Sequence, residues 1–96
     1  MPPDDERIIA TMLELLAATR DGSTICPSQV ARKLERDERD WRALMPRVRD
    51  CARTLALAGR LEVTQRGVVL SPEGDWRGAL RLRRAAQPRE QTDYDA

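Results

Sequence analysis

The sequence predicts a mainly α-helical domain with a small antiparallel β-hairpin near its end. Apolar residues recur at three- and four-residue intervals in three successive segments, as they do on the buried face of a helix. Two short stretches with strand character, 61–65 and 68–70, then flank the turn Arg66-Gly67. A length of 96 residues allows one small domain.

The first helix is expected from about Asp5 to Thr19. Acidic residues in its first turn favour a helix start, and Asp21-Gly22 ends the pattern. Its apolar face is formed by Ile9, Met12, Leu13 and Leu16. Ile8 and Leu15 widen this face beyond what one packing partner usually covers. The helix is therefore either wedged between two other elements or in contact with a second subunit.

Two further helices follow, joined by a short polar turn. Pro27 occupies the first position of a short helix, whose apolar face comprises Val30, Ala31 and Leu34. After the turn at 36–39, in which Asp37 can cap the next helix, a long amphipathic helix is expected from Asp40 to Ala58. Pro46 lies within it, so this helix either kinks there or restarts with Pro46 in its first turn.

This order of elements is that of a winged helix-turn-helix, in which a short helix, a tight turn and a longer helix precede a hairpin. We expect one such domain over residues 5–84. Residues 1–4 are Pro-rich and acidic, and residues 85–96 are polar without apolar periodicity. Both ends are therefore expected to be flexible.

Basic residues are unevenly distributed along the chain. The formal net charge is only +1, yet residues 42–84 hold ten basic and four acidic side chains. Sixteen of the seventeen basic residues are arginine. This bias reflects either overall composition or a need for the planar guanidinium, which contacts phosphates and base edges with two hydrogen bonds at once.

Position along the long helix favours the second explanation. At about 100° per residue, four arginines fall on one flank of this helix or its extension: Arg42, Arg49, Arg53 and Arg60. The corresponding helix enters the DNA major groove in helix-turn-helix proteins, so this row is expected to contact DNA; the alternative is a solvated helix face. Gln65 and Arg66 at the hairpin tip are expected to reach an adjacent groove. Ser28, at a helix start, either donates to a phosphate or caps the helix.

Several kinds of site are not expected. The chain has no histidine, and its two cysteines, Cys26 and Cys51, lack metal-ligand spacing, so we expect no metal, no cofactor and no enzyme. Both cysteines are expected to be reduced thiols. The first residues lack the features of a signal peptide, and no apolar run approaches about 20 residues. We therefore expect a cytoplasmic protein without membrane contact.

Three segments resemble a bacterial family of short winged-helix-like proteins that have no assigned function. They are Thr24-Ile-Cys-Pro-Ser-Gln-Val-Ala-Arg32, Trp41-Arg-Ala-Leu-Met-Pro-Arg-Val-Arg49 and Gly59-Arg-Leu-Glu-Val-Thr-Gln-Arg-Gly67. The resemblance covers roughly residues 8 to 84. It implies the same fold and offers no ligand or catalytic residue to carry over.

The sequence leaves two functions open. The first is a small DNA-binding protein, regulatory or accessory, that uses its third helix and its wing. The second is a winged helix that serves as a protein-interaction or dimerisation module, which other domains of this fold are. The contacts of a homodimer would then be Ile8, Leu15 and Leu57, of which Leu57 is expected on the outer face of the long helix.

Overall fold

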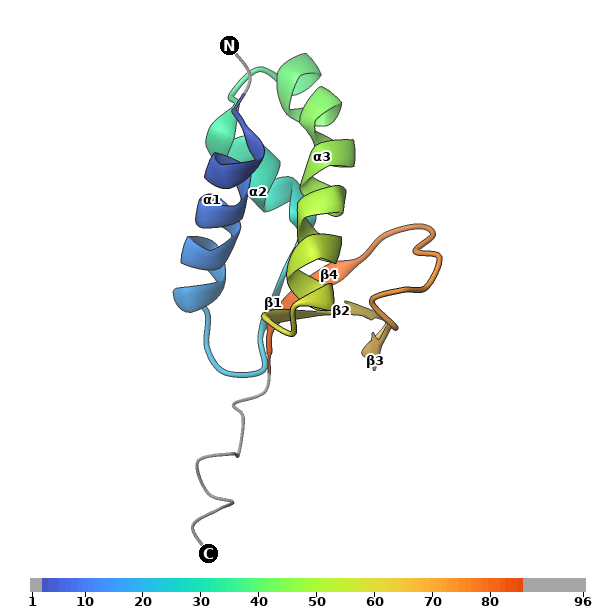
Figure 1. Cartoon of the computed structure of the whole chain (residues 1–96). Helices are drawn as coiled ribbons and strands as arrows, with labels where there is room; N and C mark the ends of the chain where they lie inside the picture. Colours follow the sequence, from blue (N-terminus) through green and yellow to red (C-terminus); the bar gives the residue numbers. More distant parts are fainter. Residues whose placement is uncertain (1–2, 86–96) are drawn as a thin grey trace, which may run out of the picture.

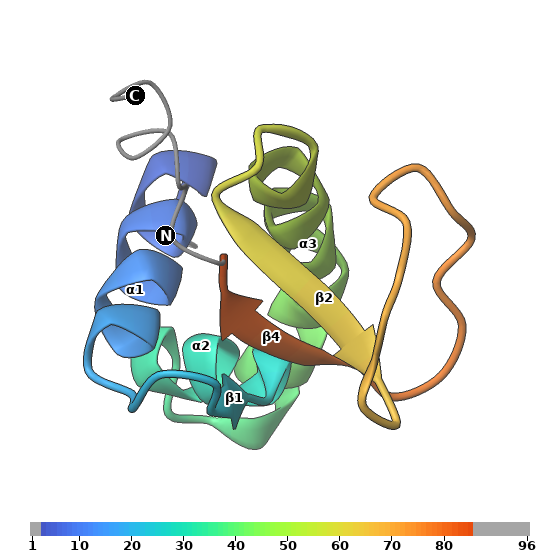
Figure 2. The same ribbon diagram turned by 90° about the horizontal axis from the view of Figure 1, so that it is seen from below.

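The computed structural model describes residues 3–85 and has mixed α/β architecture (Figure 1). Three helices, α1 (Asp5–Ala17), α2 (Pro27–Leu34) and α3 (Glu38–Leu57), pack on one face of a four-stranded antiparallel sheet. The strands are β1 (Thr24–Ile25), β2 (Leu61–Gln65), β3 (Val68–Val69) and β4 (Arg81–Arg84). They lie in the order β1-β4-β2-β3, and Figure 2 shows β4 between β1 and β2. The helix order and the sheet are compatible with a winged-helix-like arrangement.

The sheet is larger than the predicted hairpin. The hairpin of β2 and β3 forms as expected, but β4 lies at the centre of the sheet and pairs with both β1 and β2. Leu82 on β4 faces the core and is fully buried, while Arg83 faces Glu62 across the β2–β4 pair. The guanidinium of Arg83 donates to this carboxylate at 2.6 Å. The fold is therefore mixed α/β, and the prediction of a mainly α domain underestimated the sheet.

Side chains stabilise the starts of all three helices. Asp4 caps α1, because its carboxylate accepts from the backbone N–H of Arg7 at 2.9 Å. Asp37 caps α3 in the same way, as predicted. At α2 the amide oxygen of Gln29 accepts from the backbone N–H of Cys26. Asp4 was assigned to the flexible N-terminal end, yet it is an ordered part of the fold; residues 86–96 of the predicted C-terminal end lie outside the described residues.

Helix α3 is continuous through Pro46. Pro46 is exposed on the outer side of the helix, where the carbonyl of Arg42, which lacks its usual N–H donor, can bind water. Of the two possibilities left by the sequence, a restart at Pro46 is therefore wrong.

The core lies between the helices and the sheet. It combines Ile8, Met12 and Leu16 of α1 with apolar residues of the other elements, namely Ile25, Val30, Ala31, Leu44, Val48, Cys51, Ala52, Leu55, Leu61, Val63, Trp76, Leu80 and Leu82. Helix α1 contacts α2, α3, β1 and β4, which explains its broad apolar face. Ile8 is fully buried within this core, so its assignment to a dimer contact is wrong.

Candidate nucleic-acid interface

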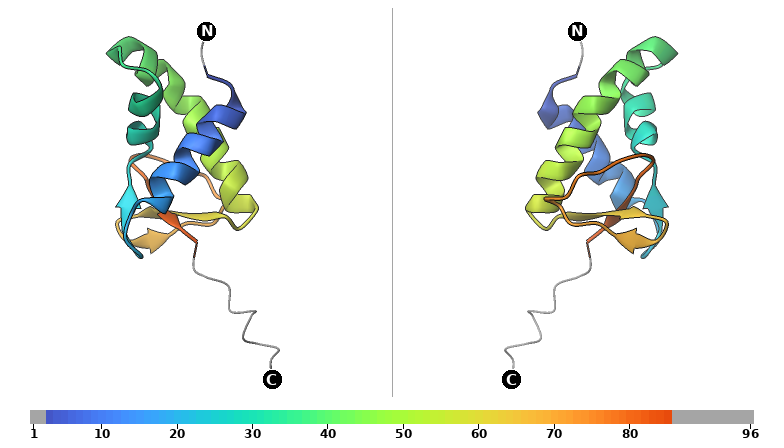
Figure 3. Two further views of the ribbon diagram at one scale, coloured as in Figure 1. Left: turned by 90° about the vertical axis from the view of Figure 1, so that its left-hand side faces the viewer. Right: turned by 90° about the vertical axis from the view of Figure 1, so that its right-hand side faces the viewer.

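The connection between β2 and β4 lies along α3. We call residues 66–80, which include β3, the 66–80 loop. Seen from the side in Figure 3, this loop passes beside the C-terminal half of α3, and the sheet closes the bottom of the molecule. The surface available to a ligand on this side is therefore made jointly by α3 and the loop.

Two arginines of α3 hold the loop in place. Arg53 donates through Nη1 to the carbonyls of Pro72 (2.7 Å) and Gly74 (2.9 Å). Its guanidinium also lies over the ring of Trp76, 4.1 Å from the ring centroid. One helical turn earlier, Arg49 donates to the carbonyls of Trp76 (2.9 Å) and Gly78 (3.2 Å). Both guanidinium groups thus serve as structural contacts.

Gln65 holds the same loop from the sheet side. Its Nε2 donates to the carbonyls of Arg77 (2.5 Å) and Ala79 (3.1 Å). The carbonyls of residues 76 and 78 accept from Arg49 on α3, and those of residues 77 and 79 accept from Gln65 on β2. Four consecutive carbonyls are thus fixed by side chains. Residues 76–79 are therefore held between helix and sheet by side chains instead of by a backbone ladder.

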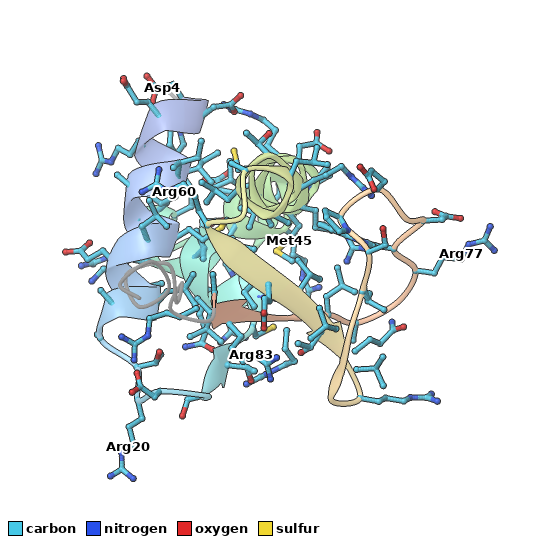
Figure 4. The ribbon with its side chains drawn as sticks, turned by 60° about the horizontal axis from the view of Figure 1, so that its bottom comes forward. Asp4, Arg20, Met45, Arg60, Arg77 and Arg83 are labelled. Carbon is cyan, nitrogen blue, oxygen red and sulfur yellow. The ribbon has the colours of Figure 1, made fainter. Side chains whose placement is uncertain are left out.

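The predicted arginine row is divided by these contacts. Arg49 and Arg53 face the loop, whereas Arg42 is exposed, forms an ion pair with Glu38 at 2.7 Å and stacks on Trp41. Arg60 lies on the α1 side of the molecule, while Arg77 extends from the loop on the opposite side (Figure 4). Helical phase correctly placed Arg49 and Arg53 on one flank, but the partner of that flank is the chain's own loop.

The remaining predicted residues lie in three different settings. Arg66 is exposed at the turn between β2 and β3, as expected, whereas Gln65 is committed to the loop. Ser28 lies in the first turn of α2 with its Oγ 3.0 Å from the Sγ of Cys26, a local contact at the helix start. The structure therefore does not bring Ser28, Arg42 and Arg60 together with the turn.

A cleft opens between the β2–β3 turn, the loop and the start of β4. It is lined by Gln65, Arg66, Arg77, Gly78, Ala79 and Arg81, which include three arginines and no carboxylate. Sequence reasoning missed Arg77 and Arg81, because they become neighbours of Arg66 only when β4 pairs with β2. Apolar and basic residues alternate over 80–83, which is typical of a strand with Arg81 on its outer face, but no local signal identifies the neighbours of Arg81.

The proposed dimer contacts are only partly exposed. Leu57 is 54% exposed on α3 and Leu15 is half-buried against the core, whereas Ile8 is inaccessible. Val68 and Val69 on the edge strand β3 are 63% and 49% exposed, and sequence reasoning did not single them out. The apolar surface thus lies at separate places along the molecule.

The two thiols differ in environment. Cys51 is buried in α3, and burial, followed by the nearby Asp5 carboxylate, raises the pKa of its thiol to about 11. Cys26 is half-buried and, like Cys51, is a free thiol. Within residues 3–85 no cluster of three or more metal-ligating side chains occurs. No helix in this part of the chain is long and apolar enough to cross a membrane.

Comparison with known proteins identifies a family but no activity. No curated protein matches the chain. A family model described as a protein of unknown function (DUF3253) matches residues 5–85, which is most of the chain and all of the helices and strands. The chain therefore belongs to this family of uncharacterised proteins.

Proposed function

We propose that this protein binds DNA through the arginine-lined cleft and the adjacent flank of α3. The single observation that carries the proposal is the cleft, whose lining includes Arg66, Arg77 and Arg81 and no carboxylate. Arginine in such a position binds phosphate oxygens by charge and by paired hydrogen bonds. We propose a binding role in the cytoplasm, without a catalytic step.

The arrangement of elements supports the same function. In winged helix-turn-helix proteins the second helix of the motif and the segment that follows it contact the duplex together. In this proposal, α3 and the 66–80 loop correspond to these two elements. Arg42 lies on the same flank of α3 as Arg49, about 10 Å further along the helix axis, and Arg49 contacts the residues on either side of Arg77. A phosphate backbone can thus follow α3 from Arg42 to the cleft.

Salt dependence and substitution test this function. If the three cleft arginines neutralise three phosphates, log K should fall against log salt with a slope of about −2.7. We would measure the fluorescence anisotropy of a labelled duplex at low salt with the unmodified protein and with the double variant Arg66→Gln, Arg77→Gln. The double variant should reduce the slope by about two and weaken binding.

The matched control replaces two arginines outside the cleft. Arg20 points away from the loop (Figure 4), and Arg39 is exposed at the start of α3. The double variant Arg20→Gln, Arg39→Gln has the same net charge as the cleft variant. Equal losses in both variants would show a general charge effect and would contradict a role of the cleft. Absence of binding at tens of micromolar protein would reject the proposed function.

A second candidate function is favoured by the exposed apolar side chains. Val68 and Val69 lie on the edge strand β3, and Leu57 lies near the end of α3. Exposed apolar residues on an edge strand favour pairing with another chain. Sedimentation equilibrium of the full chain tests this function. A dimer that Val69→Lys dissociates supports self-association through β3, whereas a monomer at high concentration argues against it.

A further inference from the structure

We propose that the cleft at the β2–β3 turn is a site for one phosphate-type oxyanion, either a nucleic-acid phosphate or a free phosphate group. The inference rests on the proposed function only for the first of these two sources. It is carried by three features of the cleft: its charged donors, its backbone and the conformation of Arg66.

The charged donors of the cleft are only partly engaged within the protein. Arg81 donates through Nε and Nη2 to Thr24, which leaves its Nη1 available. Arg77 forms an ion pair with Asp75 at 2.8 Å, and both side chains are largely exposed. Within residues 3–85, Arg66 forms no ion pair. For these three guanidinium groups, an incoming anion would therefore compete with one carboxylate, that of the exposed Asp75, among the described residues.

Backbone donors of residues that line the cleft lack a backbone partner. The carbonyls of residues 76–79 are occupied by Arg49 and Gln65, as described above. In the described part of the chain, by contrast, the backbone N–H groups of Arg77, Gly78 and Ala79 have no backbone acceptor. With the acceptors satisfied, this segment has mainly donors left to offer. Sites built from backbone N–H groups and guanidinium groups favour anions.

The conformation of Arg66 supports a role for its side chain. Arg66 has a φ of 54° and Gly67 a φ of 81°, so both central residues of the two-residue turn are left-handed. Such turns favour asparagine or glycine at the first position, and another residue costs about 1 kcal/mol. Strain of this kind is typical of functional positions. The turn places a guanidinium at the rim of the cleft, where an asparagine could not supply the charge.

An NMR titration tests the inference. Backbone amide spectra of the full chain would be recorded with increasing sodium phosphate, against sodium chloride at the same ionic strength, and separately with duplex DNA. Phosphate should shift the Gly78 and Arg66 signals to saturation, and chloride should not. Arg66→Asn, which suits the turn, should weaken phosphate binding about tenfold, since it removes a charge-assisted hydrogen bond. Asp75→Asn should strengthen binding, and Arg20→Gln is the matched control.

The outcomes separate the inference from the proposed function. Saturable cleft shifts with both phosphate and DNA support both. Saturable shifts with phosphate and no DNA binding support the site and reject DNA as its ligand. DNA binding without shifts at Gly78 and Arg66 rejects DNA as the ligand of the cleft, and it overturns the site if phosphate also causes no shifts there. Phosphate shifts that match those with chloride, or that are unchanged in Arg66→Asn, also overturn it.

Discussion

Replacing Arg53 by methionine should detach the 66–80 loop from α3. Arg53 supplies two charge-assisted hydrogen bonds, to the carbonyls of Pro72 and Gly74, and a cation–π contact with Trp76. At a partly exposed site each bond contributes about 1 kcal/mol, and the cation–π contact contributes about 0.5–1 kcal/mol. Methionine preserves the apolar part of the arginine side chain, so the substitution removes mainly the guanidinium contacts. Because the released loop regains conformational freedom, we expect the free energy of unfolding to fall by about 2 kcal/mol.

The assay combines urea unfolding with tryptophan emission. In a Trp41→Phe background Trp76 is the sole tryptophan, since the chain has two. Trp76 is 8% exposed, and its Nε1 donates to the carbonyl of Ser71. Loss of the guanidinium above its ring should therefore shift the native emission to longer wavelength. The same substitution at Arg39, which is exposed on the same helix, should change neither quantity.

An Arg53→Met variant with native emission and with stability within about 0.5 kcal/mol of its parent would refute the reasoning. The result also bears on DNA binding. If the loop detaches, Arg53→Met weakens binding because it displaces the cleft. Loss of binding in Arg49 or Arg53 variants therefore does not by itself identify a phosphate contact, whereas loss in Arg77→Gln, which leaves the loop in place, does.

Three further predictions concern stability. Arg66→Asn should raise the thermal midpoint, because asparagine tolerates the left-handed turn at a cost lower by up to about 1 kcal/mol; an unchanged or lower midpoint would show that the turn is not strained. The pKa of Cys51, about 11 in the fold against 9.0 without it, means that the unfolded chain loses this proton first as the pH rises. Stability should therefore decline between pH 9 and 11, and less so in Cys51→Ala; equal declines in urea titrations would contradict the burial argument. Glu62→Gln should cost about 1 kcal/mol, because it weakens the cross-strand pair with Arg83, and a cost near zero in urea unfolding would show that the pair is fully screened.

The helices were predictable because the signals that define them are local. Apolar spacing located all three, and Asp37 was correctly identified as the cap of α3. The hairpin of β2 and β3 followed from two short apolar stretches around Arg66-Gly67. The pairing of β1 with β4 and the central place of β4 in the sheet were not predictable in the same way. Each strand is a short segment whose pairing partner lies far along the chain, and only tertiary contact decides such pairing.

The candidate site shows the same division between local and distant information. Helical phase placed Arg49 and Arg53 on one flank, but it contains no information about what covers that flank. The carbonyl groups that they bind belong to residues 19 to 29 positions further on. Arg66 was identified because a turn tip is exposed whatever surrounds it, whereas Arg77 and Arg81 needed the sheet to bring them beside it.

Side chains hold residues 76–79 in position, but these contacts do not protect the amide protons of Arg77, Gly78 and Ala79 from exchange with solvent. In a strand, the hydrogen bonds that fix the backbone usually engage its own amide protons, so slow deuterium uptake and fixed position go together. Here the fixed groups are carbonyls, and the amides of Arg77, Gly78 and Ala79 have no backbone acceptor among the described residues. Rapid deuterium uptake in this segment would therefore not show that it moves. A ligand that bonds these amides would slow their exchange while the coordinates of the loop stay the same.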